Sequence, residues 1–162
     1  MTSCRANCFD ASALVKVFVT EQGSDLILEY FYNRSPTKYT TPFCFYETLN
    51  VLKVKWMYRH EISRDEYTNA AFSLTAWFGC SSRSVRDIDF SDPVVSFRAL
   101  EIVKQYSLDL SDAFQILSVR TGYFAGLVSD SSTILVTADK RLAETARAYG
   151  VRAWYFLGEP EP

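Results

Sequence analysis

The sequence predicts an α/β protein with three layers, in which a central, mainly parallel sheet is flanked by helices on both faces. Segments typical of strands alternate with segments typical of helices along the chain, which is the pattern of parallel βαβ units. The length of 162 residues, with 48 % hydrophobic and 22 % charged residues, suits one core of ordinary size. We therefore expect a single domain over residues 1–157 and a short tail over residues 158–162.

Several segments have strand character and mark the order of the sheet-forming elements. The first strand has a polar start, whereas the segment at residues 133–137 is apolar and rich in β-forming residues. The expected strands are a first one that starts at about residue 5 and ends with residues 8–10, followed by residues 38–41, 85–90, 133–137 and 151–156.

Helices are expected between the strands, and several have recognisable ends. Pro42 suits the first helical position after Thr41, and Ser63 with Glu66 three residues later has the pattern of a capping box. Gly150 suits the end of the last helix. The expected helices are residues 12–18, 24–33, 42–58, 63–78, 91–106, 111–121 and 140–149.

Four acids lie where a strand pattern gives way to a helix pattern, or in the first turns of a helix. They are Asp10 in FDASALVK, Glu47 in FYETLNVL, Asp112 in LDLSDAFQIL and Asp139 in ILVTADKRLAETA. Sites in parallel sheets lie at the carboxyl ends of strands, so these acids predict a shared acidic pocket. Such a pocket is unfavourable unless a hard cation neutralises it, and oxygen ligands suit Mg²⁺ or Mn²⁺. Asp10 and Asp139 suit helix N-caps equally well, and both roles are compatible.

Glu47 lies on an apolar side of its helix, which makes it informative. One stripe of this helix consists of Phe45, Leu49, Leu52 and Trp56, and the other places Glu47 with Val51, Val54 and Tyr58. We expect a helix with two apolar sides to be buried on both, and a buried Glu to have a partner. A cation is one such partner; a salt bridge or simple exposure of Glu47 is the alternative.

Composition limits the remaining function classes. The net charge of −2 and the pI of about 5.4 give no overall basic field that would attract nucleic acid. Four cysteines without a CxxC pair and a single histidine, His60, argue against a zinc site and favour reduced thiols. The chain has no apolar run long enough for a membrane span and no signal-peptide pattern at its start, so we expect a cytoplasmic protein.

Taken together, DASALVK, the Glu in YETLNVL, LSDA and TADKRLAETA resemble the pattern of PIN-domain ribonucleases, and most of all VapC-like toxins of type II toxin–antitoxin modules. The resemblance spans residues 10–154 in order and spacing. It implies a PIN-like fold and a nuclease whose metal-ligating, catalytic acids are Asp10, Glu47, Asp112 and Asp139, with Ser12 and Thr137 as accessory residues.

The resemblance also implies cofactors, products and partners. We expect one or two Mg²⁺ or Mn²⁺ ions, an RNA substrate cut to a 5′-phosphate and a 3′-hydroxyl, a homodimer and a small antitoxin protein. Lys16, Lys140 and Arg141 are candidate contacts to the RNA backbone, although each suits solvated surface as well. The aromatic runs at residues 30–32 and 43–46 suit either the core or a face for a dimer or an antitoxin.

Other functions remain open on the sequence alone. A stand-alone RNA-processing PIN nuclease and a non-catalytic PIN-like binding scaffold are the main alternatives. Haloacid-dehalogenase-like phosphatases need a second Asp two residues after the first, and that position is Ser12. A receiver domain needs a further acidic pair near the first strand, which the sequence lacks.

Overall fold

The computed structural model describes residues 5–82 and 88–162, and within them four parallel strands form one sheet. The strands are β1 (Ala6–Phe9), β2 (Thr37–Tyr39), β3 (Ile134–Thr137) and β4 (Arg152–Tyr155). Their order is β2-β1-β3-β4, so the first strand of the chain pairs with both β2 and β3. The predicted α/β class with a parallel sheet and helices on both faces is confirmed.

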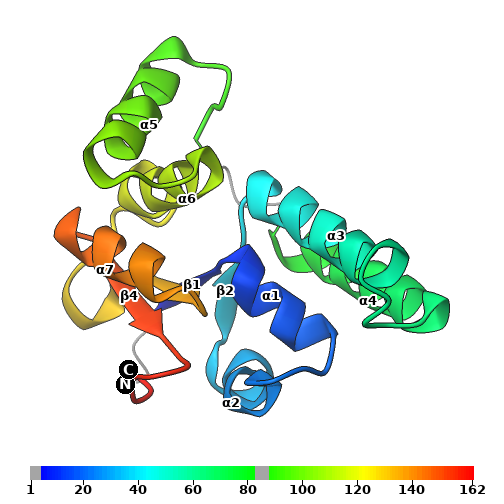
Figure 1. The fold of residues 1–162 in the computed structure, drawn as a ribbon. Helices are drawn as coiled ribbons and strands as arrows, with labels where there is room; N and C mark the ends of the chain where they lie inside the picture. The colour runs from blue at the N-terminus through cyan, green and yellow to red at the C-terminus, as the bar shows by residue number, and fades with distance from the viewer. Residues whose placement is uncertain (1–4, 83–87) are drawn as a thin grey trace.

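The helices connect the strands and cover the sheet (Figure 1). They are α1 (Ala11–Phe18), α2 (Ser24–Glu29), α3 (Pro42–Met57), α4 (Arg64–Trp77), α5 (Pro93–Tyr106), α6 (Leu110–Thr121) and α7 (Lys140–Ala148). Short π-helical turns follow α2 and α4, at Tyr30–Arg34 and Phe78–Ser82, and a 3₁₀ turn lies at Ser129–Ser131.

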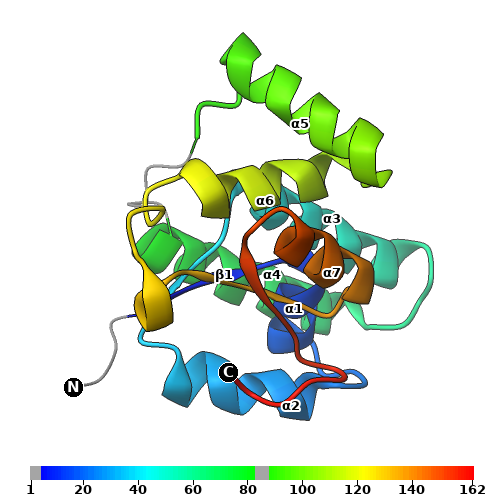
Figure 2. The ribbon, with the colours of Figure 1, turned by 90° about the vertical axis from the view of Figure 1, so that its left-hand side faces the viewer.

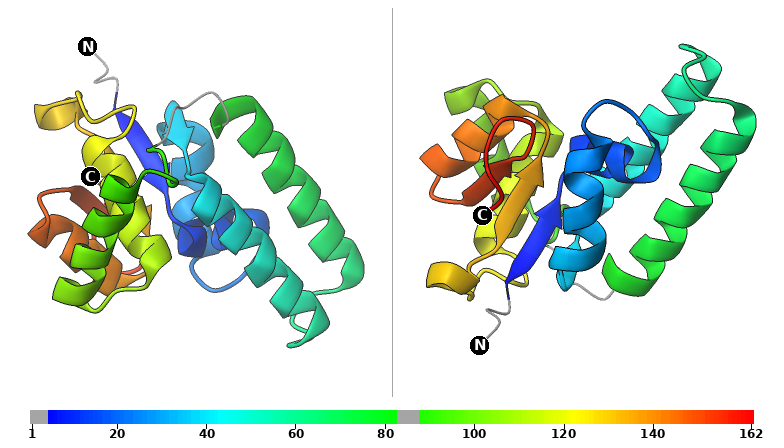
Figure 3. Two further views of the ribbon diagram at one scale, coloured as in Figure 1. Left: turned by 90° about the horizontal axis from the view of Figure 1, so that it is seen from above. Right: turned by 90° about the horizontal axis from the view of Figure 1, so that it is seen from below.

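Each face of the sheet has its own hydrophobic core. Phe9 of β1 and Val136 of β3 lie in the core that α1, α2, α3 and α4 cover, whereas Cys8 and Leu135 lie in the core covered by α5, α6 and α7. This alternation is what a strand period of two dictates. Figure 2 shows α5 and α6 on one side of the strands and α2 on the other, and Figure 3 shows α3 and α4 as an antiparallel pair.

Local capping explains several helix starts. Thr41 caps α3, its side chain accepting from the amide of Cys44, and Pro42 is the first helical residue. Ser63 and Glu66 form the reciprocal capping box of α4, with both bonds present. These predictions from the sequence are confirmed.

The expected strand at residues 85–90 is wrong where the structure can test it. Ile88 and Asp89 have no regular structure, and Phe90 lies in a turn; residues 85–87 are outside the described part of the chain. Asp89 Oδ1 accepts from both the amide and the hydroxyl of Ser91, which closes a local turn instead of a ladder. Phe90 packs against Phe43 of α3 and Phe114 of α6, so its apolar side chain contacts helices and not a neighbouring strand.

Two smaller expectations need correction. The helix predicted over residues 24–33 keeps its α-helical form only to Glu29 and then continues as the π-helical turn. The second apolar stripe of α3 is only half-buried at Val51 and Val54, and Tyr58 is 67 % exposed, because α3 and α4 extend beyond the sheet. Across the described ranges, no helix combines the length and apolar character that crossing a membrane requires.

Candidate functional site

Asp10 is the most firmly held acid at the carboxyl edge of the sheet. It follows β1, caps α1 and is only 4 % exposed. Its Oδ2 atom accepts from the hydroxyl of Ser12 at 2.6 Å and from that of Thr137 at 3.0 Å. Those hydroxyls accept in turn from the amides of Ala138 and Asp139, so the ends of β1 and β3 are joined through this carboxylate.

Glu47 lies in the second turn of α3 and has one carboxylate oxygen without a partner. The Oε2 atom is buried and accepts no hydrogen bond. Burial raises the pKa of Glu47, and the nearby charges of Asp10 and Asp109 raise it further, while Ser111 partly offsets the rise. Burying a carboxylate oxygen without a hydrogen-bond donor costs free energy. The described residues therefore leave the hydrogen bonding of the Glu47 carboxylate incomplete.

Asp112, in the first turn of α6, shows how closely the acids are grouped. Its pKa is raised to about 7, first by burial and then by the charges of Asp10, Glu47, Asp139 and Asp109, in that order. Carboxylates from four different parts of the chain therefore act on one another across this edge. Ordinary Asp is fully ionised well below pH 7, so burial and the neighbouring carboxylates together strongly disfavour the charged form of Asp112.

Asp139 and Asp109 lie at the exposed margin of this group. Asp139 caps α7, its Oδ1 atom accepting from the amides of Arg141 at 2.8 Å and Leu142 at 3.1 Å. Asp109 occupies the N-cap position of α6 without a side-chain capping bond. The N-cap role expected for Asp10 and Asp139 is confirmed, and it leaves the other oxygen of Asp139 outside the cap.

Basic residues beside the acids are mostly engaged with acids of their own. Lys16 pairs with Glu21 at 2.7 Å, and Lys55 pairs with Glu21 at 2.7 Å and Glu61 at 2.6 Å. A cavity of about 270 Å³ lies against this network and against Ser12 and Glu47. The positive charge of Lys16, a candidate RNA contact, is therefore balanced by Glu21 in this structure.

The other two candidate RNA contacts differ from each other. Lys140 is exposed and lies 3.8 Å from Glu144, one turn along α7. Arg141 donates to the main-chain oxygens of Tyr106 at 3.1 Å and Ser107 at 2.8 Å, which ties α7 to the end of α5. Lys140 is thus the more accessible of the pair, whereas Arg141 has a structural role.

A buried polar network beneath Asp10 was not found by sequence reasoning. Gln115 is fully buried; its Oε1 atom accepts from the hydroxyl of Thr41 at 2.8 Å and from the thiol of Cys44 at 3.2 Å. The Cys44 sulfur also lies 3.6 Å from Asp10 Oδ1, and burial raises the pKa of this thiol well above its usual value. Gln115 follows Asp112 by three residues on α6, and that spacing was the one available signal.

Surface exposure sorts the remaining predicted residues. His60 and Cys80 are exposed, whereas the thiols of Cys8 and Cys44 are buried. Of the aromatic runs, Tyr32 and Tyr46 are 60 % and 68 % exposed, and their neighbours are largely core.

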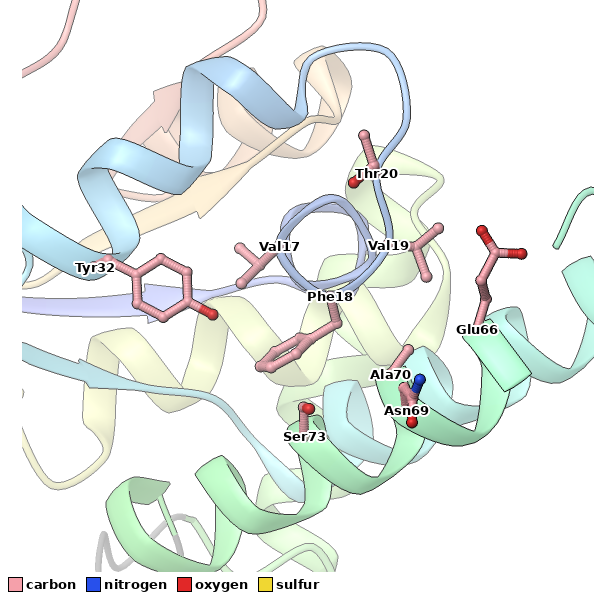
Figure 4. Close-up of a pocket in the computed structure, with 9 residues that line it drawn as sticks. All are labelled: Val17, Phe18, Val19, Thr20, Tyr32, Glu66, Asn69, Ala70 and Ser73. Carbon is pink, nitrogen blue, oxygen red and sulfur yellow. The ribbon is translucent and has the colours of Figure 1, made fainter. Parts of the chain in front are cut away.

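A second cavity, of about 300 Å³, lies between the end of α1 and α4 (Figure 4). Its one acid is Glu66, whose Oε2 atom accepts from the Ser63 amide in the capping box. The side chains of Asn69 and Ser73 line the α4 wall, and Tyr32 lies across from them. None of the acids at the carboxyl edge of the sheet lines this cavity, so it is separate from the candidate site.

The donor chemistry of the carboxyl edge fits a hard divalent cation. The available groups are carboxylate and hydroxyl oxygens, and Glu47 Oε2 lacks a donor. In residues 5–82 and 88–162, no group of three or more His, Cys, Asp or Glu side chains is arranged to hold a metal ion as it stands. No family model and no curated protein matches this chain.

Proposed function

We propose that this protein is a metal-dependent endoribonuclease with a PIN-like fold, acting as the toxin of a toxin–antitoxin module. The observation that carries the proposal is the buried Oε2 atom of Glu47, which accepts no hydrogen bond from the described residues and lies in the field of Asp10 and Asp109. A divalent cation would relieve that repulsion, whereas a salt bridge would need a basic group. Lys16 and Lys55, which border the same cavity, are both paired with Glu21.

The residues have distinct parts in this proposal. Asp10, Glu47 and Asp112 would hold Mg²⁺ or Mn²⁺, with Asp139 at the margin. When bound, such an ion polarises the phosphate and lowers the pKa of a water that attacks phosphorus. Ser12 and Thr137 orient Asp10 by donating to its Oδ2 atom. Orientation of this kind typically changes metal affinity or activity by about 10- to 100-fold.

The direct test is cleavage of total RNA by the purified chain with Mg²⁺ or Mn²⁺, beside EDTA. Glu47→Gln removes the charge and keeps the shape, and Glu101→Gln is the matched control on the exposed face of α5. We expect metal-dependent cleavage that is lost with EDTA and in Glu47→Gln, and retained in Glu101→Gln. Intact RNA in every lane, from protein shown by circular dichroism to be folded and free of antitoxin, would favour a binding scaffold.

The toxin role has a separate test. Expression of the chain should arrest growth, and co-expression of a small neighbouring gene should relieve the arrest. Cleavage without growth arrest would favour a stand-alone RNA-processing nuclease. The partly exposed Tyr32 and Tyr46 are the aromatic residues we propose for contact with an antitoxin or a second copy.

A further inference from the structure

Three arginines converge at the opposite, amino edge of the sheet, far along the strands from the acids. Arg5 precedes β1, Arg34 ends the turn before β2, and Arg152 begins β4. All three line one cavity of about 440 Å³, together with Asn7 and Asp130. Its size lies within the usual range for small-molecule sites, and three guanidinium groups face one carboxylate of the lining.

A chain of buried polar side chains runs from the lining residues Arg5 and Asn7 into the core. Arg5 Nη2 donates to the Tyr30 hydroxyl at 3.1 Å, which donates to Asn7 Oδ1 at 2.7 Å. Asn7 Nδ2 donates to Ser35 Oγ at 2.9 Å. Asn7 and Tyr30 are each 1 % exposed, and Ser35 is 2 % exposed. The position of Arg5 is therefore fixed from within the core.

The walls hold the other two guanidinium groups. Arg152 Nη1 donates to the main-chain oxygens of Ser129 and Asp130, both at 3.2 Å. Arg34 is about half exposed and has its Nη1 atom 2.7 Å from Glu161 Oε2. Arg34 is held by ion pairs at the surface, with Glu161 and with Glu29 at 3.8 Å, whereas Arg5 and Arg152 are bonded to a buried side chain and to the main chain.

The tail of the chain supplies oxygens to the same arginines. Besides the pair between Glu161 and Arg34, the main-chain oxygen of Pro162 accepts from Arg5 Nη2 at 3.3 Å. Glu159 holds the tail in place by pairing with Arg147 and by accepting from the Tyr155 amide. The tail therefore presents oxygen acceptors where an external anion would bind.

We propose that this arginine cavity binds a phosphomonoester, whose phosphate displaces the Glu161 carboxylate from Arg34. Guanidinium forks match phosphate oxygens with paired, charge-assisted hydrogen bonds, which makes arginine the favoured residue for this recognition. The volume beyond the phosphate accommodates the group that it esterifies. This site is independent of the nuclease proposal, since it shares no residue with the carboxyl edge.

Trp154 is a built-in reporter of the displacement. Its Nε1 atom donates to the main-chain oxygen of Glu159 at 3.2 Å, and its ring centre lies 4.6 Å from that of Tyr30. Movement of the tail therefore changes the surroundings of this indole. Trp154→Phe should remove the fluorescence change, which assigns the signal to Trp154 and not to Trp56 or Trp77.

The experiment titrates the full chain, in EDTA and at constant ionic strength, with adenosine 5′-monophosphate and with inorganic phosphate, by calorimetry and by fluorescence. Arg34→Ala should weaken binding of the monophosphate by about ten-fold, as expected for a lost hydrogen bond to a charged group. Glu161→Gln should tighten it by about two- to five-fold, because the internal competitor is removed. Arg98→Ala, an exposed arginine on α5, is the matched control and should leave affinity unchanged.

The two substitutions should change the affinity for the monophosphate in opposite directions, weaker in Arg34→Ala and tighter in Glu161→Gln. A purely structural ion pair between these residues would not give this result. Unchanged affinity in Arg34→Ala would overturn the proposal, as would weaker binding in Glu161→Gln. Binding of inorganic phosphate with exclusion of the monophosphate would overturn the phosphomonoester assignment. No heat or fluorescence change beyond that of chloride would exclude the site altogether.

Discussion

The two ends of strand β1 present opposite chemistry, and they differ in how their charges are balanced. At the carboxyl end, burial and then the charges of Asp10 and the other nearby acids raise the pKa of Asp112 to about 7. At the amino end, Arg5 is met by oxygens of the Tyr30 hydroxyl and the tail. The arginine edge is thus compensated by the chain itself, whereas at the acidic edge the nearby lysines of the described residues, Lys16 and Lys55, are paired with Glu21 and Glu61. On our proposals, a ligand at the arginine edge would displace an internal partner, and the acidic edge would bind an added cation.

The largest expected effect is on the activity proposed for the acidic edge. Asp10→Asn should lower metal-dependent RNA cleavage by more than about 100-fold, because replacing even a residue that orients a metal ligand costs 10- to 100-fold. Single-turnover cleavage rates measure it. Asp25→Asn, an exposed acid on α2, is the matched control. Equal rates for Asp10→Asn and the wild type would place the chemistry elsewhere.

The next largest effect is on stability at the arginine edge. Asn7→Ala should lower the free energy of unfolding by about 2 kcal/mol, because the buried Tyr30 and Ser35 hydroxyls lose their partner. Urea denaturation measures the change. Asn50→Ala, on the exposed side of α3, should stay within about 0.5 kcal/mol of the wild type. A small effect at Asn7 would mean that water replaces it readily.

A pH-dependent effect should distinguish the acidic edge. The folded pKa of Asp112, about 7, lies above its ordinary value of 3.8, so the folded state binds the proton more tightly than the unfolded state. The stabilisation that the folded state gains by binding this proton is therefore lost as the pH rises from about 4 through 7.

Asp112→Asn has no carboxylate to ionise at this position, so its folded state should not lose stability in this pH range. The variant should therefore be more stable than the wild type at pH 8 without metal. We expect about 1–2 kcal/mol, after allowing for solvent screening, and no gain from this source below pH 4. Thermal melts in EDTA at pH 4 and pH 8 measure it, with Glu101→Gln as control. A stabilisation independent of pH would show that the acids do not repel one another.

The smallest expected effect is at the exposed ion pair. Arg34→Ala should change the free energy of unfolding by less than about 0.5 kcal/mol, since exposed pairs contribute little. Its effect on phosphomonoester binding should nevertheless be clear, which separates recognition from stability. A loss above 1 kcal/mol in urea denaturation would instead make Arg34 part of the fold.

Much of the fold was predictable because helix caps and apolar strand segments have recognisable sequence patterns. The caps at Thr41, Ser63 and Asp139 fixed helix starts, and Thr137 and Trp154 lie in strands with clear apolar character. The strand order was not predictable, because the pairing of Asn7 with Ile134 joins segments far apart in the chain. The expected strand around Phe90 failed since apolar alternation suits packing on helices as well as pairing in a sheet.

The grouping of the acids followed from their places at strand ends, for Asp10 and Asp139, and in the first turns of helices, for Glu47 and Asp112, but their hydrogen-bond partners could not be predicted in this way. The unpartnered Oε2 atom of Glu47 and the neutralisation of Lys16 by Glu21 depend on side-chain directions that no spacing rule gives. The arginine cavity was not predicted either. Arg5, Arg34 and Arg152 come from three segments far apart in the sequence, and only the tertiary fold brings them together. Sequence patterns locate backbone elements, whereas charge balance is decided by tertiary contacts.

The pairing of β1 with β3 has a consequence for how the protein is made. Asp10 is synthesised before its hydroxyl donor Thr137, which lies 127 positions later in the chain. Contacts of such long range form late in folding, because the loop must close before they contribute. During translation the carboxylate therefore has the local donor Ser12, but it lacks Thr137 until β3 has left the ribosome. The nascent chain has no assembled acidic edge, and the order of synthesis itself delays whatever activity that edge provides.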